Sequence, residues 1–137
     1  MASFQAKEWL KAAYSDLRNI EHILDDSYLT HMVAFHSQQA IEKSFKAIME
    51  NMSMPIPRVH KLENLVSKIN IELEFNVEIL ETLDLLYIES RYPGDMGLLP
   101  HGKPALQDAE EFYNMAKNIF EQVCKLLSVT IEDITAL

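Results

Sequence analysis

All 3 glycines of the chain, and three of its 5 prolines, lie between residues 91 and 104. Elsewhere only Pro55 and Pro57 interrupt the sequence, so long glycine-free stretches lie on both sides of this segment. Apolar residues in those stretches recur at helical spacing, and no stretch keeps the alternation of a half-buried strand for long. The sequence therefore predicts an all-α protein whose helices are separated by a proline loop and by a longer loop rich in glycine and proline.

Five helices are predicted, and together they form an up-and-down bundle of four long helices plus one short helix. Ser3 and Ser27 are candidate N-caps, and Pro104 is a favoured first helical residue. We expect a single helical domain over residues 1–127, followed by a C-terminal tail, 128–137, that frays. The predicted helices span residues 4–24, 28–52, 61–69, 73–90 and 104–127. The clearest apolar face, on the last of them, comprises Leu106, Ala109, Phe112, Tyr113, Ala116, Ile119, Phe120, Val123 and Leu127.

Composition sets the limits on function. A chain of 137 residues is normally one domain, and 48% apolar residues favour a compact fold. The net charge of −9 argues against broad nonspecific nucleic-acid binding, although it leaves room for a local basic site. The lone Cys124 excludes an intramolecular disulfide and a cysteine metal cluster. No run is long and apolar enough to span a membrane, and no secretory signal opens the chain, so we expect a cytoplasmic protein with no metal and no cofactor.

The helix predicted over residues 28–52 carries two different faces. One is an apolar stripe that contains a glutamine, Gln38, which costs free energy there unless it finds a hydrogen-bond partner. The neighbouring face presents donors and two cations. One interpretation is structural: Gln38 bridges to a neighbouring helix, and the lysines are solvated. The other is that the polar face binds a ligand. The apolar stripe comprises Ala34, Ile41, Phe45 and Ile48, and the polar face comprises His36, Gln39, Lys43 and Lys46.

The loop 91–104 is the second candidate. Arg91 offers a planar fork suited to phosphate or carboxylate, and Tyr92 could stack on a base. His101 and Lys103 add further donors. We expect Arg91 to approach the polar face of the 28–52 helix and to form one positive pocket with it. The structural alternative is that Arg91 pairs with a neighbouring carboxylate or caps the preceding helix.

Four short motifs, in order, resemble those of HEPN domains, which are small all-helical domains often encoded beside minimal nucleotidyltransferases. The segment from Gln38 to Ala47 is similar to the family pattern QQAxEKxxKA. Asp16-Leu17 lies in the first predicted helix, residues 55–62 contain a His before a short helix, and residues 86–93 are similar to YxxxRYP. The resemblance covers roughly residues 4 to 127.

The resemblance implies a homodimer that binds a nucleotide or RNA and works with a minimal nucleotidyltransferase in a toxin–antitoxin-like pair. Its ribonuclease branch carries an Arg followed four to six residues later by a His, and cleaves RNA without metal. Here the next His after Arg91 is His101, ten positions on, so the usual spacing is absent. Two alternatives stay open: a metal-independent ribonuclease that uses Arg91 with His101 or His60, and a dimerisation scaffold with no ligand. The ligand-binding candidates are His36, Gln39, Lys43, Lys46, Arg91 and Tyr92.

Overall fold

A computed structural model describes residues 2–90 and 103–136 of the chain. These residues form helices and connecting segments, with no strand among them. The helices are α1 (Phe4–Ile23), α2 (Thr30–Asn51), α3 (Leu62–Val66), α4 (Val77–Ser90), α5 (Leu106–Leu127) and α6 (Ile131–Thr135).

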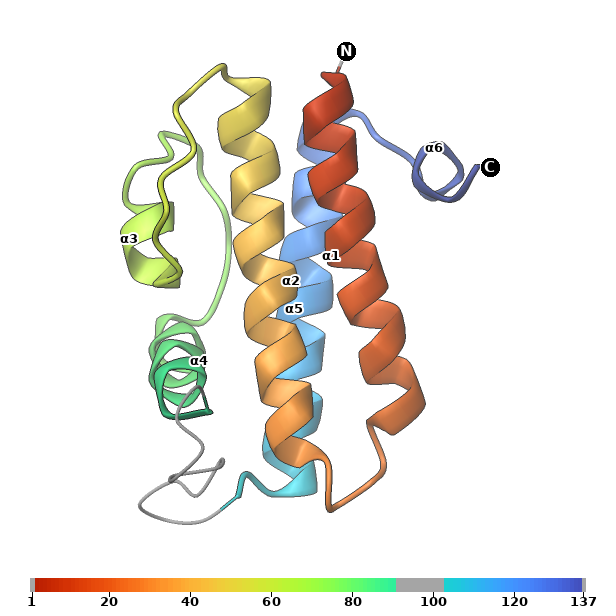
Figure 1. The fold of residues 1–137 in the computed structure, drawn as a ribbon, viewed down its shortest axis with the longest axis vertical. Helices are drawn as coiled ribbons and strands as arrows, with labels where there is room; N and C mark the ends of the chain where they lie inside the picture. The colour runs from red at the N-terminus through yellow and green to blue at the C-terminus, as the bar shows by residue number, and fades with distance from the viewer. Residues whose placement is uncertain (1, 91–102, 137) are drawn as a thin grey trace.

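The helix α2 is the centre of the bundle and packs against α1, α3, α4 and α5 (Figure 1). In that view α1 lies on one side of α2, α3 and α4 lie on the other, and α5 passes behind it. The helix α4 is seen almost along its axis, whereas α1, α2 and α5 run roughly vertically, so α4 crosses them at a steep angle (Figure 1). The predicted all-α bundle of four long helices plus one short helix is confirmed, and α6 is an addition to it.

The core is made by the apolar stripes that the sequence predicted. Each predicted member of the α2 stripe is at most 2% exposed, because α2 has a neighbour on nearly every side. On α5 the predicted face is buried with one exception, Leu106, which is 44% exposed because it is the first residue of the helix and precedes the packed turns. The fully buried large side chains include Leu10, Ile20, Ile41, Phe45, Ile48, Leu65, Leu83, Ile119 and Phe120.

Local capping was predicted correctly at one helix and wrongly at two. The Ser3 hydroxyl accepts the Ala6 N–H at 3.1 Å, as expected for the N-cap of α1. Ser27 does not cap α2, which begins later and has no side-chain cap; instead the Asp26 carboxylate accepts the Tyr28 N–H in the preceding turn. The helix α5 begins after Pro104 rather than at it, because the Asp108 carboxylate accepts the Ala105 N–H at 3.0 Å and starts the helix there.

The expectation that residues 128–137 fray is wrong for α6. Thr130 accepts the Asp133 N–H through its hydroxyl, and the Asp133 carboxylate accepts the Thr130 N–H in return, which makes a capping box. Those hydrogen bonds from Thr130 lower the pKa of Asp133. Ile134 is 5% exposed, and α6 packs against α1. Helical periodicity could not predict α6, because the helix is only about one turn long. It is held by a capping box and by one buried apolar side chain, and neither recurs along the sequence.

The predictions for Arg91, Tyr92 and His101 concern residues outside those that the structure describes. Within the described ranges, none of the helices combines the length and apolarity needed to cross a lipid bilayer.

Candidate functional site

Gln38 is fully buried in the middle of α2, and its side-chain amide is hydrogen-bonded. Its Nε2 donates to the backbone carbonyl of His60 at 2.7 Å and to Oε1 of Glu42 at 3.3 Å. Gln39 is partly exposed, and its Nε2 donates to Oε1 of Gln38 at 2.7 Å. The interpretation that Gln38 lies in the apolar stripe and finds a hydrogen-bond partner is therefore confirmed. Its partner is the segment before α3 rather than a long helix.

Glu42 is the central acceptor of the first of two carboxylate networks that involve side chains of α2. Its side chain is 5% exposed, and its oxygens receive Nζ of Lys46 at 3.1 Å and Nδ1 of His60 at 3.1 Å, in addition to the Gln38 amide. A buried carboxylate is stable only with such partners. Lys46 is itself 6% exposed and lies 5.5 Å from the centre of the Trp9 ring, so the interpretation of Lys46 as a solvated lysine is wrong.

Asp16 of α1 is the hub of the second network. One of its oxygens binds Nζ of Lys43 at 2.7 Å, and the other binds Nδ1 of His36 at 2.8 Å. The carboxylate is buried, whereas the side chains of Lys43 and His36 are 24% and 21% exposed. Asp16 therefore neutralises the charge of Lys43 and fixes the side chains of both Lys43 and His36 against α1.

Four rings connect the two networks. Phe35 stacks on Tyr87 of α4 with ring centres 5.9 Å apart and planes inclined by 18°. His36 meets Phe35 edge-on at 5.3 Å, and His60 lies 5.6 Å from Tyr87. We call His36, Phe35, Tyr87 and His60 the aromatic strip. A histidine stands at each end of the strip, and each histidine has its Nδ1 on a buried carboxylate.

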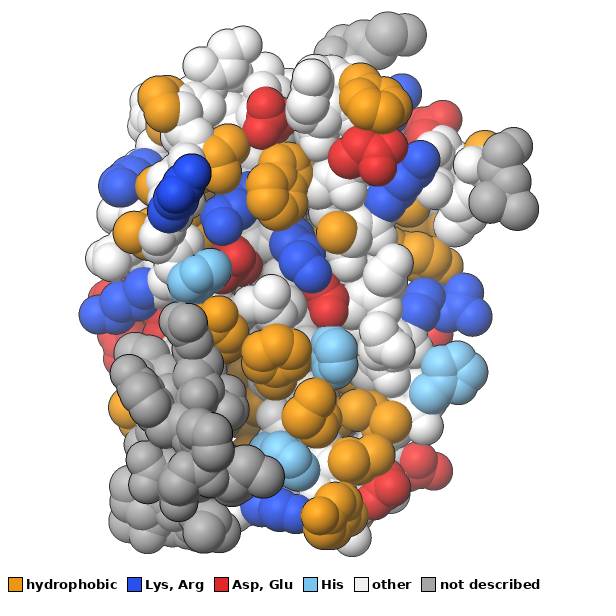
Figure 2. Space-filling model, in the orientation of Figure 1, with side chains coloured by type: hydrophobic (Ala, Val, Ile, Leu, Met, Phe, Trp, Pro, Cys, Tyr) orange, Lys and Arg blue, Asp and Glu red, His pale blue; other side chains and the backbone are white. Residues whose placement is uncertain are grey.

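Figure 2 shows a face of the molecule on which histidine and hydrophobic side chains are interleaved, with lysine and arginine side chains nearby. Phe35, His36 and Tyr87 are half-buried, and the side chain of His60 is 45% exposed. Arg58 and Lys61, on either side of His60 in the sequence, are exposed. The surface around His60 thus combines accessible rings with cations, although the whole chain is acidic.

Comparison with known proteins assigns the chain to a family. The family model described as the HEPN domain matches residues 6–127, which is most of the chain. The chain belongs to the HEPN domain family. The crystal structure of TT1696 from Thermus thermophilus is similar at 25% identity and a TM-score of 0.72, and the match covers 90% of this chain and 98% of that one. The crystal structure of ST0689, an archaeal HEPN homologue, is similar at 26% identity and a TM-score of 0.67, covering 91% and 99%. A comparison with curated proteins finds no match.

The HEPN motif residues on α2 are hydrogen-bonded to one another and to His60. The network comprises Gln38, Gln39, Glu42, Lys46 and His60, and only His60 is exposed. The structure thus brings His60 together with Lys46 through Glu42, and His36 together with Lys43 through Asp16. Lys103, the described donor of the long loop, is engaged elsewhere: its Nζ donates to the carbonyl of Tyr28 at 2.9 Å.

The sequence did not reveal the roles of four residues in the carboxylate networks and the aromatic strip: Asp16, Glu42, Phe35 and Tyr87. In the sequence, Asp16 and Glu42 stood out only as members of the family motifs. Their role as buried hydrogen-bond acceptors follows from their contacts, which only the structure shows. Phe35 and Tyr87 are 52 positions apart, and no local pattern pairs them. One feature of the sequence could have indicated the role of Phe35. It is a large apolar residue next to His36, yet it lies outside the predicted apolar stripe.

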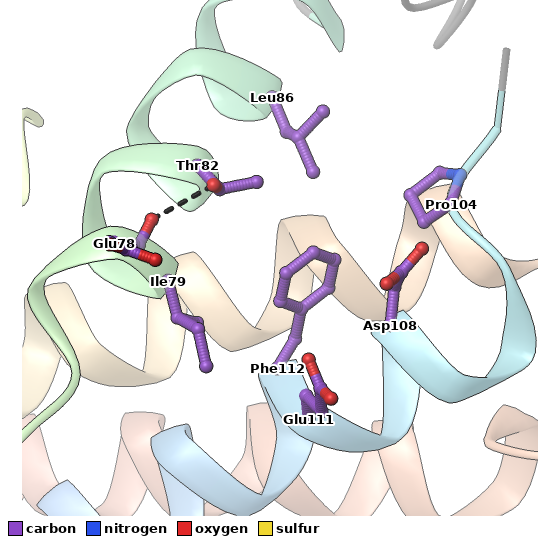
Figure 3. Close-up of a pocket in the computed structure, with 8 residues that line it drawn as sticks. All are labelled: Glu78, Ile79, Thr82, Leu86, Pro104, Asp108, Glu111 and Phe112. Atoms are coloured by element: carbon purple, nitrogen blue, oxygen red, sulfur yellow. Dashed lines mark hydrogen bonds between the residues drawn. The ribbon is translucent and has the colours of Figure 1, made fainter. Parts of the chain in front are cut away.

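A hollow of about 290 Å³ lies between α4 and α5 (Figure 3). Its floor is apolar, with Ile79, Leu86 and Phe112, and carboxylates stand around it. Carboxylates repel phosphate, so this hollow does not suit a nucleotide. The described part of the HEPN domain also contains no group of three or more histidine, cysteine or acidic side chains placed to hold a metal ion.

Proposed function

We propose that this HEPN protein binds a nucleotide or RNA on the aromatic strip and serves as the accessory member of a toxin–antitoxin-like pair with a minimal nucleotidyltransferase. The observation that carries the proposal is the strip itself: stacked, partly exposed rings with an oriented histidine at each end. Aromatic rings bind bases by stacking, with roughly 1–3 kcal/mol per base, and exposed cations nearby supply phosphate contacts. Among the ligand-binding candidates, His36 is a member of the strip, and Lys43 shares the Asp16 carboxylate with it. Gln39 and Lys46 are connected to His60 through Gln38 and Glu42.

The charge distribution supports local rather than general binding of anions. Lys43 and Lys46 are already paired with Asp16 and Glu42, so they contribute less to phosphate binding than free lysines would. Arg58 and Lys61 are better placed, because both are exposed beside His60 and the contact of Lys61 with Glu63 is long, at 3.9 Å, and exposed to solvent. Arg91 and Tyr92 remain proposed members of the site through their sequence motif.

The binding proposal is tested with Phe35→Ala against a matched control, Phe4→Ala. Phe4 is 71% exposed at the start of α1 and has no part in the strip. We expect nucleotides or short RNA to raise the melting temperature of the wild type, because a ligand selective for the folded state must stabilise it. Phe35→Ala should lose this stabilisation, whereas Phe4→Ala should keep it. If no nucleotide or RNA stabilises the wild type, the protein is a scaffold without a ligand.

The partner and the oligomeric state need separate measurements. We propose a homodimer in the cytoplasm, since two-fold dimers are the commonest assemblies and the family resemblance implies one. Light scattering of the purified protein measures its mass, and a monomer at micromolar concentration would contradict the dimer. Co-expression with the protein encoded next to it, followed by co-purification, tests the pair, and a neighbour that is not a nucleotidyltransferase or that does not co-purify would contradict it.

A second function, metal-independent cleavage of RNA, is favoured by one observation. His60 is exposed and donates its Nδ1 proton to a buried carboxylate, which is the arrangement that orients a general base. In such a reaction His60 would take the proton of the 2′-hydroxyl, whose oxygen attacks the phosphorus and displaces the 5′-oxygen. Purified protein is incubated with RNA in a metal chelator; cleavage that is lost in His60→Ala supports this function. Loss in Arg91→Ala or His101→Ala tests the other candidates.

A further inference from the structure

The proton of the neutral His60 ring has a fixed position. Nδ1 lies 3.1 Å from Oε1 of Glu42, and Glu42 also receives the Lys46 ammonium and the Gln38 amide. An ionised carboxylate only accepts hydrogen bonds, so Nδ1 carries the hydrogen. The lone pair of the neutral ring is then on Nε2. Among the described residues, no hydrogen bond to Nε2 is present.

The orientation of the ring is fixed as well as its tautomer. Gln38 holds the backbone carbonyl of His60 at 2.7 Å, Glu42 holds Nδ1, and Tyr87 packs beside the ring at 5.6 Å. These contacts come from α2 and α4, two helices of the core. His60 therefore presents an acceptor at a defined place on the surface, at the end of the stacked pair Phe35–Tyr87.

An acceptor at that place selects for a donor on the ligand. A base that stacks on Phe35 and Tyr87 carries its sugar at the edge of the strip. Phosphate oxygens cannot donate to a neutral Nε2, and the exposed cations Arg58 and Lys61 suit them instead. Within a strand, where the 3′- and 5′-oxygens are esterified, the sugar offers a donor only in RNA, since the 2′-hydroxyl is the group by which a protein distinguishes RNA from DNA.

We propose that Nε2 of His60 accepts a hydrogen bond from a ribose 2′-hydroxyl and thereby makes the aromatic strip selective for RNA over DNA. This inference rests on the proposed function, because it requires nucleic acid on the strip. His60 is a better candidate than His36, which has the same type of carboxylate partner, because its side chain is 45% exposed against 21% for His36. Glu42 and Gln38 act as positioning residues.

The test compares three short, single-stranded, random-sequence pools of equal length: RNA, DNA and 2′-O-methyl RNA. Binding to each is measured by fluorescence anisotropy at one salt concentration. The 2′-O-methyl pool keeps the RNA sugar shape but has no hydroxyl to donate. We expect the wild type to prefer RNA to both other pools by about 3- to 10-fold, which is the range of one net hydrogen bond.

The variant His60→Phe keeps a ring beside Tyr87 and removes the acceptor, so it should bind all three pools about equally. The control is His22→Phe, which changes an exposed histidine of α1 outside the strip and should keep the RNA preference. Glu42→Gln, with its fold checked by circular dichroism, should weaken the preference because the amide can bond either tautomer.

Three results overturn the inference while leaving the proposed function intact. They are equal binding of RNA and DNA by the wild type, equal binding of RNA and 2′-O-methyl RNA, and an RNA preference that survives in His60→Phe. Failure of the wild type to bind any of the pools or any free nucleotide overturns both the inference and the proposed function.

Discussion

The carboxylate of Asp84 on α4 accepts the backbone N–H of Leu62, the first residue of α3, at 2.7 Å. Its second oxygen accepts the N–H of Glu63 at 3.2 Å. Lys61, at the N-cap position of α3, offers no side-chain hydrogen bond of its own. A helix of five residues is unstable alone, so α3 depends on this cap supplied by another helix. The cap also fixes the segment that carries His60.

Asp84→Ala should lower the free energy of unfolding by about 1–3 kcal/mol, because it leaves two backbone donors at the start of α3 without their acceptor. Urea denaturation measures the change. The matched control is Glu81→Ala on the same helix, where the side chain is exposed and the change should be less than about 0.5 kcal/mol. Equal effects of the two substitutions would mean that the cap contributes nothing specific.

Asp84 should also affect how stability depends on pH. Burial raises the pKa of Asp84 above its usual value of 3.8. Between the unfolded and folded pKa values the folded state then binds more protons than the unfolded state, so stability rises as pH falls through that window and is lost as pH rises. Compared with Asp84→Asn, which does not titrate, the wild type should gain stability as the pH is lowered from neutral toward about 4. A difference that stays constant with pH would contradict the raised pKa.

The two adjacent glutamines should respond very differently to truncation. Gln38→Ala leaves the His60 carbonyl and one oxygen of Glu42 without the buried donor that they share, so it should cost roughly 1–3 kcal/mol of folding stability. Gln39→Ala removes a partly exposed amide and should cost less than about 1 kcal/mol. Thermal and urea unfolding of both variants measure this, and a larger loss in Gln39→Ala would contradict the assignment of Gln38 as the structural residue.

Ser128→Gly should stabilise the protein. Ser128 ends α5 in the left-handed conformation, with φ 57°, while the next N–H bonds back to the carbonyl of Cys124 at 2.9 Å. Glycine adopts this conformation without the steric cost of a Cβ, which is about 1 kcal/mol or more. The control is Ser67→Gly at the end of α3, where φ is −66° and glycine should only destabilise. A lower melting temperature for Ser128→Gly would contradict the prediction.

The parts of this fold that could be predicted from sequence are those that depend on helical period. Ala34, Ile41, Phe45 and Ile48 recur at that period, and all are buried. The reverse holds for Asp84: its partners are 22 and 21 positions away, and nothing near it in sequence marks it as a cap.

The candidate site was predictable only in part for the same reason. The donors on α2 could be identified as a polar face, but their acceptor Asp16 lies on another helix. The sequence therefore identified Lys43 as a cation of this face but not the carboxylate that pairs with it. Charge on a surface depends on which cations are already paired, and that depends on the packing of α1 against α2.

Asp16→Asn should strengthen the binding of RNA. The substitution removes the negative charge that holds Lys43 and His36, so the Lys43 ammonium becomes available to a phosphate. Each phosphate contact that is added to a single strand makes the logarithm of affinity fall more steeply with the logarithm of salt concentration, by roughly 0.7. We therefore expect tighter binding at low salt and a steeper salt dependence than in the wild type, measured by anisotropy over a salt series.

The control, Glu132→Gln on α6, makes the same change in net charge at an exposed position outside the strip and should leave the slope unchanged. An equal effect of both substitutions would mean that only net charge matters, and an effect of neither would place the RNA away from α2.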